Sequence, residues 1–254
     1  MIFRRPRVKA YWWIGNPAAP VRNFGDGMAP LLLERFAGVP CEWDTVSRSC
    51  VVTTGSVLEH IPPLWEGFVL GAGKLWEDSR LHLRGGPAEV LAVRGPLSAK
   101  SVPGDFALGD PGLLADALVP VQSRTTGLGI VPHWSDAALA RDPRFYSDRW
   151  TTEVIDVRGD PLKVIAAIGR CEKIVTSSLH GLITADAFTI PRRLEPGGRL
   201  AAEGGYFKFR DYSASIQAPF EPGALYRANR VYVEDRRFEL MDAYERLGEL
   251  LRSR

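Results

Sequence analysis

Short apolar runs that alternate with helix-like segments are the feature that most constrains the fold of this chain. In the first half, PLLLERFAG (30–38) has a helical pattern that Gly38 is expected to end. Near-continuous Val, Ile and Leu runs are typical of strands buried on both faces of a sheet. The alternation therefore predicts an α/β fold with a parallel sheet and crossover helices. The strands are expected in VKAYWWI (8–14), SCVVTTGSV (49–57), GFVLGAGKL (67–75) and EVLAVRG (89–95).

A second set of the same kind begins near Gly127. The segment VPVQSRTTG (119–127) between the two sets is polar and rich in turn residues. We therefore predict two Rossmann-like halves that face a cleft, over residues 1–120 and 127–254, the second ending in a surface helix near 236–254. In the second half we expect strands in GLGIVPHW (127–134), TEVIDV (152–157) and EKIVTSS (172–178), helices in DPLKVIAAIGRC (160–171) and LHGLITADAF (179–188), and an exit segment IPRRLEP (190–196).

Composition excludes several classes of protein. The chain has 32 basic and 30 acidic side chains, a formal charge of +2, so nucleic acid is not expected as a partner. Its three cysteines show no close-paired spacing, which argues against a disulfide framework or a zinc site and makes the cytoplasm the expected compartment. We expect no signal peptide at the N-terminus and no membrane span. Peripheral membrane contact stays open.

The best candidates for chemistry follow the predicted strands. In open parallel sheets, ligands bind outside the carboxyl ends of the strands. RNFGDGMAP (22–30) and GAGKLWE (71–77) occupy such positions, as do His133, Trp134 and the turn 177–181. Gly-Asp and Gly-x-Gly turns are common, and GAG lacks the third glycine of a dinucleotide motif, so neither segment identifies a site alone.

His180 has more context than the other histidines. TSSLHG (176–181) places hydroxyl groups and backbone N–H groups at a predicted helix N-terminus, where anions bind. A histidine there could change protonation near physiological pH. Position alone also allows a capping histidine that bonds to the backbone, and both interpretations stay open. No spacing typical of metal ligands occurs, so we expect no metal.

The segment SSLHGLITADAFTIPRR (177–193) resembles the signature of the polysaccharide pyruvyltransferase family, especially its bacterial exopolysaccharide members. In that signature a Leu-His turn opens a helix that leads to small residues and Pro. The other motifs of the family occur in order, from about residue 23 to about residue 216: NFGD (23–26), LGAG (70–73), VRGPLSAK (93–100), LGDPGLL (108–114), VPHW (131–134) and KFRDYSASI (208–216). Ser178 departs from the pattern, because many relatives carry Arg there.

The resemblance implies a two-domain fold of the GT-B type, with an acceptor side in the first half and a donor side in the second. It also implies phosphoenolpyruvate as the donor substrate, no cofactor, and a sugar of an exopolysaccharide repeat unit as the acceptor. The product would be a cyclic pyruvate ketal, with release of phosphate. The acceptor would be a lipid-linked oligosaccharide at the inner face of the membrane.

The same resemblance suggests roles for individual residues. His180 would transfer a proton or bind phosphate, and such chemistry calls for a proton donor tuned near neutrality. Asp26 would bind acceptor hydroxyls or act as base, or else cap the following helix. The residues expected to bind substrate are Asn23, Arg94, His133, Ser177, Ser178, Gly181 and Lys208. Asp211 would orient Lys208 or be structural, and Arg192 and Arg193 would be further anion binders.

Two alternatives use the same architecture. One is a glycosyltransferase that takes a nucleotide sugar, since a fold does not fix a function. The other is a non-catalytic member of the family that binds glycan or organises a biosynthetic complex. The turn at 177–181 favours a pyruvyl donor over the first alternative. His180, Arg94 and Lys208 argue against the second.

Overall fold

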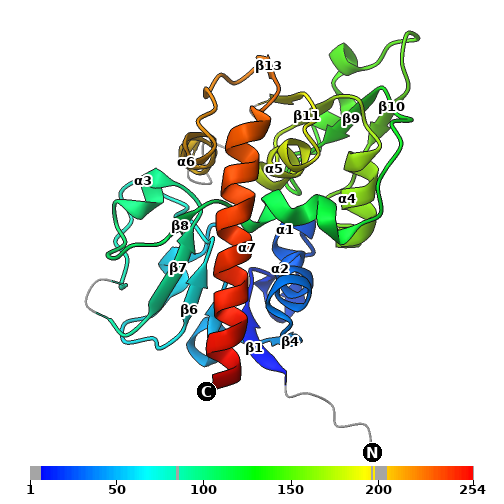
Figure 1. Cartoon of the computed structure of the whole chain (residues 1–254). Helices are drawn as coiled ribbons and strands as arrows, with labels where there is room; N and C mark the ends of the chain where they lie inside the picture. Colours follow the sequence, from blue (N-terminus) through cyan, green and yellow to red (C-terminus); the bar gives the residue numbers. More distant parts are fainter. Residues whose placement is uncertain (1–6, 84–85, 196, 198–204, 254) are drawn as a thin grey trace, which may run out of the picture.

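The computed structural model describes residues 7–83, 86–195, 197 and 205–253. Two sheets form the α/β framework (Figure 1). The first sheet is parallel throughout. Its strands are, in spatial order, β4 (Cys41–Trp43), β1 (Val8–Tyr11), β5 (Val51–Val52), β6 (Phe68–Leu70), β7 (Glu89–Val93) and β8 (Ala107–Leu108). Two expectations fall partly outside the described residues. The absence of a signal peptide concerns residues 1–6, and the expected exit segment includes Pro196.

The second sheet has four parallel strands and one antiparallel edge strand. Its order is β10 (Thr152–Val154), β9 (Leu128–Val131), β11 (Ile174–Thr176), β12 (Arg192–Leu194) and β13 (Leu225–Tyr226). A separate hairpin joins β2 (Gly15–Asn16) and β3 (Ala19–Pro20). The prediction of an α/β fold with parallel sheets is confirmed. The observed strands are shorter than the apolar runs, because each run continues past the strand into the turn that follows it.

Helices connect the strands. The α-helices are α1 (Phe24–Gly27), α2 (Ala29–Leu32), α3 (Pro96–Ala99), α4 (Pro161–Gly169), α5 (Leu179–Ala187), α6 (Phe207–Ser215) and α7 (Arg230–Ser253). A π-helical turn, Leu33–Ala37, continues α2, and Gly38 ends it with φ of 65°, as predicted for this glycine. Short 3₁₀ segments cover Val46–Arg48, Leu58–His60, Pro111–Leu118, Leu139–Arg141 and Pro143–Phe145.

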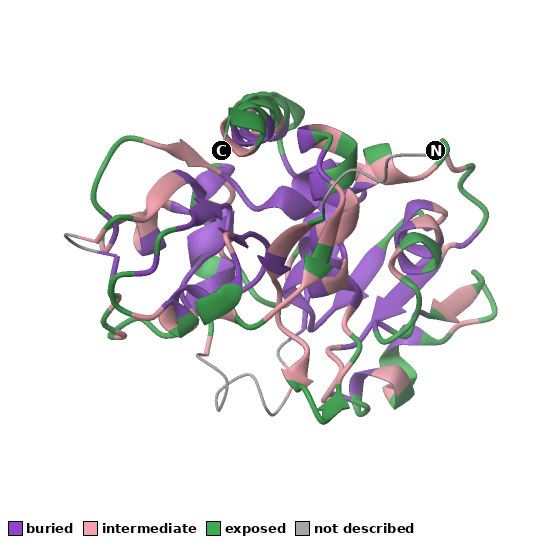
Figure 2. Cartoon of the chain, turned by 90° about the horizontal axis from the view of Figure 1, so that it is seen from below, coloured by how far each residue is buried: buried purple, intermediate pink, exposed green. Residues whose placement is uncertain are grey.

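The C-terminal helix α7 begins at Arg230, several residues before the expected start. It extends from the second sheet back across the first (Figure 1). Figure 2 shows its buried side facing the sheets and its exposed side facing solvent. The hydroxyls of Thr53 and Tyr244 lie 3.1 Å apart in the interior, which ties α7 to the end of β5. Within the described part of the chain, no helix has the length and apolar character that a membrane crossing requires.

One continuous core joins the two sheets. Its buried side chains include Ala10 and Phe68 from the first sheet, and Val131 and Ile174 from the second. Because the strands of each sheet run parallel, the loops that leave their carboxyl ends gather on one side of that sheet. These loops supply the cavity described next.

Candidate active site

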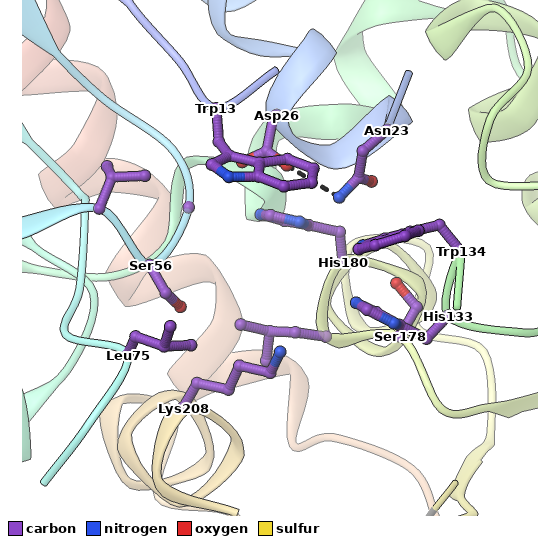
Figure 3. A pocket seen from close by; sticks show the side chains of 13 residues that line it. Trp13, Asn23, Asp26, Ser56, Leu75, His133, Trp134, Ser178, His180 and Lys208 are labelled. Carbon is purple, nitrogen blue, oxygen red and sulfur yellow. Dashed lines mark hydrogen bonds between the residues drawn. The ribbon is translucent and has the colours of Figure 1, made fainter. Parts of the chain in front are cut away.

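A cavity of about 250 Å³ lies where loops from both sheets meet (Figure 3). It is lined by Trp13, Asn23, Asp26, Gly55, Ser56, Val57, Leu75, His133, Trp134, Ser178, Leu179, His180 and Lys208. Most of these residues lie shortly after a strand. The structure therefore brings together six residues that the sequence suggested for substrate binding or catalysis: Asn23, Asp26, His133, Ser178, His180 and Lys208.

The NFGD segment forms one wall of the cavity. Asn23 caps α1, with its Oδ1 accepting a hydrogen bond from the Gly25 N–H (3.2 Å), and its Nδ2 donates to Asp26 Oδ2 (2.8 Å). A Cβ at Gly25 would overlap the imidazole of His180. Gly55 has φ of +99°, and a Cβ there would lie 2.5 Å from Asp26 Oδ1. Glycine at these two positions makes room for the two candidate catalytic side chains.

Asp26 is a buried carboxyl, with 6% of the residue exposed. Burial raises its pKa to about 7, and the neighbouring Asp110 carboxyl adds to the increase, while Lys208 opposes it. The protonated and ionised forms of Asp26 are therefore both populated near neutral pH. This is the property that general acid–base catalysis requires.

His180 lies in the first turn of α5. Ser178 caps this helix, since its Oγ accepts a hydrogen bond from the Gly181 N–H (3.3 Å). Burial lowers the pKa of His180 to about 3, and the positive charges of Arg94 and Lys208 lower it further. The imidazole is therefore neutral at physiological pH. The expectation that His180 titrates near neutrality is wrong, and Asp26 has that property instead.

Two residues of the expected turn support the cavity without lining it. Ser177 is fully buried, and its Oγ accepts a hydrogen bond from the His133 N–H (2.9 Å). This contact joins the ends of β9 and β11. Gly181 is buried in the first turn of α5. Their expected substrate contacts would be indirect in this arrangement.

Arg94 is the residue whose position differs most from expectation. It is fully buried and does not line the cavity. Its Nε donates to Asp211 Oδ2 (3.0 Å), Nη1 to Ser56 Oγ (2.7 Å), and Nη2 to the Lys74 carbonyl (2.6 Å). Arg94 thus joins α6 to the first sheet and holds Ser56 at the cavity wall.

Asp211 belongs to the same buried network. In addition to Arg94, its carboxylate accepts hydrogen bonds from the Leu97 and Ser98 N–H groups (2.9 Å each) and from Ser98 Oγ (2.6 Å). It therefore caps α3 from α6. This geometry supports the structural interpretation of Asp211.

Lys208 supplies positive charge to the cavity from α6 (Figure 3). His133 lies nearby, with Nδ1 2.8 Å from Ser135 Oγ, and burial lowers its pKa to about 4. The two arginines proposed as further anion binders are paired elsewhere: Arg192 with Asp186 in the interior, and Arg193 with Glu195. Among the described residues, no three His, Cys, Asp or Glu side chains are grouped as a metal site requires.

Trp13 and Ser56 line the cavity although the sequence patterns do not identify them, whereas Trp134 was expected at a strand end beside His133. Trp13 follows β1, and Trp134 follows β9, and their ring centroids lie 5.8 Å apart. Trp13 continues an apolar run, which places it in a predicted strand rather than in a site. Ser56 has no signal beyond its place after β5. Only the pairing of the two halves brings these side chains together.

Comparisons with known proteins agree with the motifs in this site. The family model described as polysaccharide pyruvyl transferase matches residues 83–193. The chain is 30% identical over 237 residues to the succinoglycan biosynthesis protein ExoV of Rhizobium meliloti (strain 1021). The aligned region covers 90% of this chain and 69% of that protein. It is also 37% identical over 92 residues to uncharacterized protein L143 of Acanthamoeba polyphaga mimivirus, covering 34% of this chain and 31% of that protein. The chain belongs to the polysaccharide pyruvyltransferase family.

Proposed function

We propose that the enzyme moves the pyruvyl group of phosphoenolpyruvate onto two hydroxyls of one sugar in an exopolysaccharide unit. The product is a cyclic pyruvate ketal, and phosphate is released. The observation that carries this proposal is the cavity, in which an acid with a pKa near 7 (Asp26), a neutral imidazole (His180) and a cation (Lys208) lie together.

Anion binding is the first requirement, because phosphoenolpyruvate carries a phosphate and a carboxylate. Lys208 faces the cavity, and so does the N-terminus of α5 through Ser178, Leu179 and His180. The first N–H groups of a helix have no acceptor within it and favour negative charge. Lys208 would thus provide the cation that many relatives place at the position of Ser178.

Proton transfer is the second requirement. The protonated carboxyl of Asp26 gives its proton to C3 of the enol, which makes C2 electrophilic. A sugar hydroxyl then forms a bond to C2, and its proton goes to a base in the cavity. When the C2–O bond to phosphate breaks, phosphate leaves with the electron pair and a second hydroxyl closes the ketal. Two hydroxyl protons leave the sugar. One restores the proton that Asp26 gave to C3, and the other goes to phosphate, so the reaction balances.

Sugar binding is the third requirement, and aromatic rings commonly provide it with an apolar face. Trp13 and Trp134 form such a wall from the two halves of the molecule. A second cavity of about 390 Å³ shares Trp13 and Asn23 with the first. The two adjacent cavities support an acceptor longer than one sugar, in line with the predicted lipid-linked oligosaccharide.

We also infer that the two halves, residues 1–120 and 127–254, form a GT-B-like pair of domains. Two mainly parallel sheets with a site between their loops support this assignment. The donor would bind beside α5, and the acceptor beside Trp13 and Asn23. A cytoplasmic location, with contact at the inner face of the membrane, stays a prediction.

Thermal-shift measurements test the donor class. We expect phosphoenolpyruvate to raise the Tm by mass action, as any ligand of the native state does, and UDP and GDP sugars to leave it unchanged. The Lys208→Met variant should lose the shift. Stabilisation by a nucleotide sugar alone would contradict the proposal and favour a glycosyltransferase. A lack of response to millimolar phosphoenolpyruvate would favour a non-catalytic protein.

A further inference from the structure

Asp110 belongs to the LGDPGLL segment, to which the proposed function assigns no role. It follows β8 and caps the 3₁₀ segment Pro111–Leu118, with its Oδ1 accepting a hydrogen bond from the Gly112 N–H (2.9 Å). The side chain is completely buried. A cap of this kind is commonly exposed, and Asn or Ser serves equally well. Burial of an ionisable group at this position therefore calls for a second role.

The second role is indicated by the atom that faces Asp110. Nε2 of His180 lies 3.8 Å from Asp110 Oδ1. Both Nε2 and Asp110 Oδ2 are sealed from solvent and have no hydrogen-bond partner among the residues that the structure describes. A buried polar atom left unpaired costs about 1–3 kcal/mol, so both atoms are unfavourable until they gain a partner. Nε2 can donate a hydrogen bond, and the carboxylate of Asp110 can accept one.

The imidazole is held between Asp110 and the cavity. Its ring lies against Gly25, and Phe24 packs on it edge to face with centroids 6.4 Å apart. His180 lines the cavity while Nε2 is sealed from it, so Nδ1 is the nitrogen left for substrate. A neutral imidazole carries one proton, and the partner of one nitrogen decides whether the other is a donor or an acceptor.

We propose that Asp110 is the positioning residue of His180: its carboxylate accepts the Nε2 proton in a hydrogen bond and leaves Nδ1 as the proton acceptor of the cavity. The inference rests on the proposed function for the step that uses it. The separation of 3.8 Å is longer than a hydrogen bond, but catalytic hydrogen bonds are often long without substrate and shorten when it binds.

The pair completes the proton path. As the sugar oxygen forms its bond to C2, its O–H bond breaks and Nδ1 takes the proton. The imidazolium so formed has the Asp110 carboxylate beside it, which offsets the cost of a buried positive charge near Arg94 and Lys208. Nδ1 then returns the proton to the departing phosphate, and His180 is neutral again.

The groups around the pair set its charge. Arg94 and Asp211 act on Asp110 in opposite directions, Asp26 lies close enough to interact with it, and Lys208 and His133 act on His180. Burial raises the pKa of Asp110 to about 6, so the carboxylate form prevails at neutral pH. In that form Asp110 can accept a hydrogen bond from Nε2 but cannot donate one.

The Asp110→Asn variant tests the proposal. Its amide oxygen can still accept from the Gly112 N–H at the position of Oδ1, while the negative charge that favours a proton on Nε2 is removed. We expect kcat to fall on the order of 10²-fold or more, with KM for phosphoenolpyruvate within about 3-fold, because loss of the carboxylate removes the charge that stabilises the tautomer and the imidazolium but leaves the binding site intact. The matched control is Asp142→Asn, since Asp142 also precedes a proline and caps a 3₁₀ segment, outside the cavity. We expect that control to retain kcat within about 2-fold.

Nitrogen NMR of the histidines gives a readout that does not depend on turnover. The signal of His180 is identified by its absence in His180→Gln. The proposal predicts a proton on Nε2 in the natural protein and a smaller share of that tautomer in Asp110→Asn. A proton on Nδ1 in the natural protein would overturn the proposal even if Asp110→Asn failed to fold. A folded Asp110→Asn variant with unchanged kcat would also overturn it. If the natural protein transferred no pyruvyl group but carried the predicted tautomer, the proposed function would fail and the pairing would stand.

Discussion

Gly25 of the NFGD segment lies directly against the imidazole of His180, so that any side chain at position 25 would overlap the ring. The two residues are 155 positions apart in the sequence and belong to different halves of the chain. This contact joins the first motif of the chain to the Leu-His turn. It explains why glycine is needed at position 25 even though the residue lies in a helix, where glycine is otherwise unfavourable.

We predict that Gly25→Ala will displace His180 and reduce turnover. Overpacking a buried contact of this kind costs about 1–3 kcal/mol, so the free energy of unfolding should fall by that amount. Gly86→Ala is the matched control, because its Cβ would meet no atom closer than 3.5 Å. Urea unfolding and phosphate-release kinetics of both variants check the prediction. Equal activity of the two variants would show that the position of His180 does not matter.

Asp26 should govern the response to pH. Its pKa is about 7 in the folded state, against 3.8 for an unperturbed aspartate, so the stability that its protonated form contributes is complete below pH 3.8 and is lost as the pH rises to about 7. Asp26→Asn removes this loss. We therefore expect the variant to gain stability relative to the natural protein between about pH 4 and about pH 8. Urea unfolding at both values measures the change, and a difference that is the same at both values would contradict the raised pKa.

The same carboxyl should set the high-pH limit of turnover. A proton donor acts only in its protonated form, so we expect kcat to decline as the pH rises through about 7. Asp26→Asn should lower kcat on the order of 10²-fold to 10⁴-fold, the usual contribution of a general acid. Rate profiles from acidic to alkaline pH measure this. A natural protein whose rate increases through neutral pH would instead assign Asp26 the role of base.

Arg94 and Asp211 should prove structural. Removing one partner of a fully buried ion pair leaves the other charge unpaired, which costs about 3–5 kcal/mol. We expect that loss of stability in both Arg94→Ala and Asp211→Ala, with a smaller loss in the double variant than the sum of the two. Chemical unfolding of the three variants gives the coupling. A stable Arg94→Ala protein that binds phosphoenolpyruvate weakly would restore Arg94 as a direct ligand.

Lys208 should provide most of the donor affinity that comes from a side chain. A charged hydrogen bond contributes about 1.5–3 kcal/mol, so Lys208→Met should raise the Kd for phosphoenolpyruvate about 10-fold to 100-fold. Arg210→Met is the control on the same helix, because Arg210 pairs with Glu77 at the surface and does not line the cavity. Calorimetric titration compares the two. An unchanged Kd in Lys208→Met would mean that the donor binds elsewhere.

Much of the fold could be predicted from the sequence, because parallel strands buried on both faces leave near-continuous apolar runs. The same reasoning placed Asp26, His133 and His180 in segments that follow strands, and all three line the cavity. Arg94 has the same position after a strand, yet it is buried. Its partner Asp211 is 117 residues away, and no local pattern reveals that pairing.

The protonation states of His180 and Asp26 also could not be predicted from the sequence. His180 has the sequence context of a group that titrates near neutrality, but its pKa depends on burial and on Arg94 and Lys208, which come from distant segments. Asp26 acquires the raised pKa instead, through its burial in α1 and the nearby Asp110. Trp13 was hidden for a related reason, since an aromatic residue after a strand resembles the core until a cavity opens beside it.

The most direct test of the account is a transfer assay with phosphoenolpyruvate and a galactoside or glucoside acceptor, scored by phosphate release and by mass spectrometry of the sugar. The natural protein should release phosphate only with acceptor present and should add one pyruvyl ketal to the sugar, while folded His180→Ala and Asp26→Asn variants should do neither at a comparable rate. Near-normal turnover by a well-folded His180→Ala variant would contradict the catalytic assignment. Transfer from a nucleotide sugar in place of phosphoenolpyruvate would contradict the proposed function.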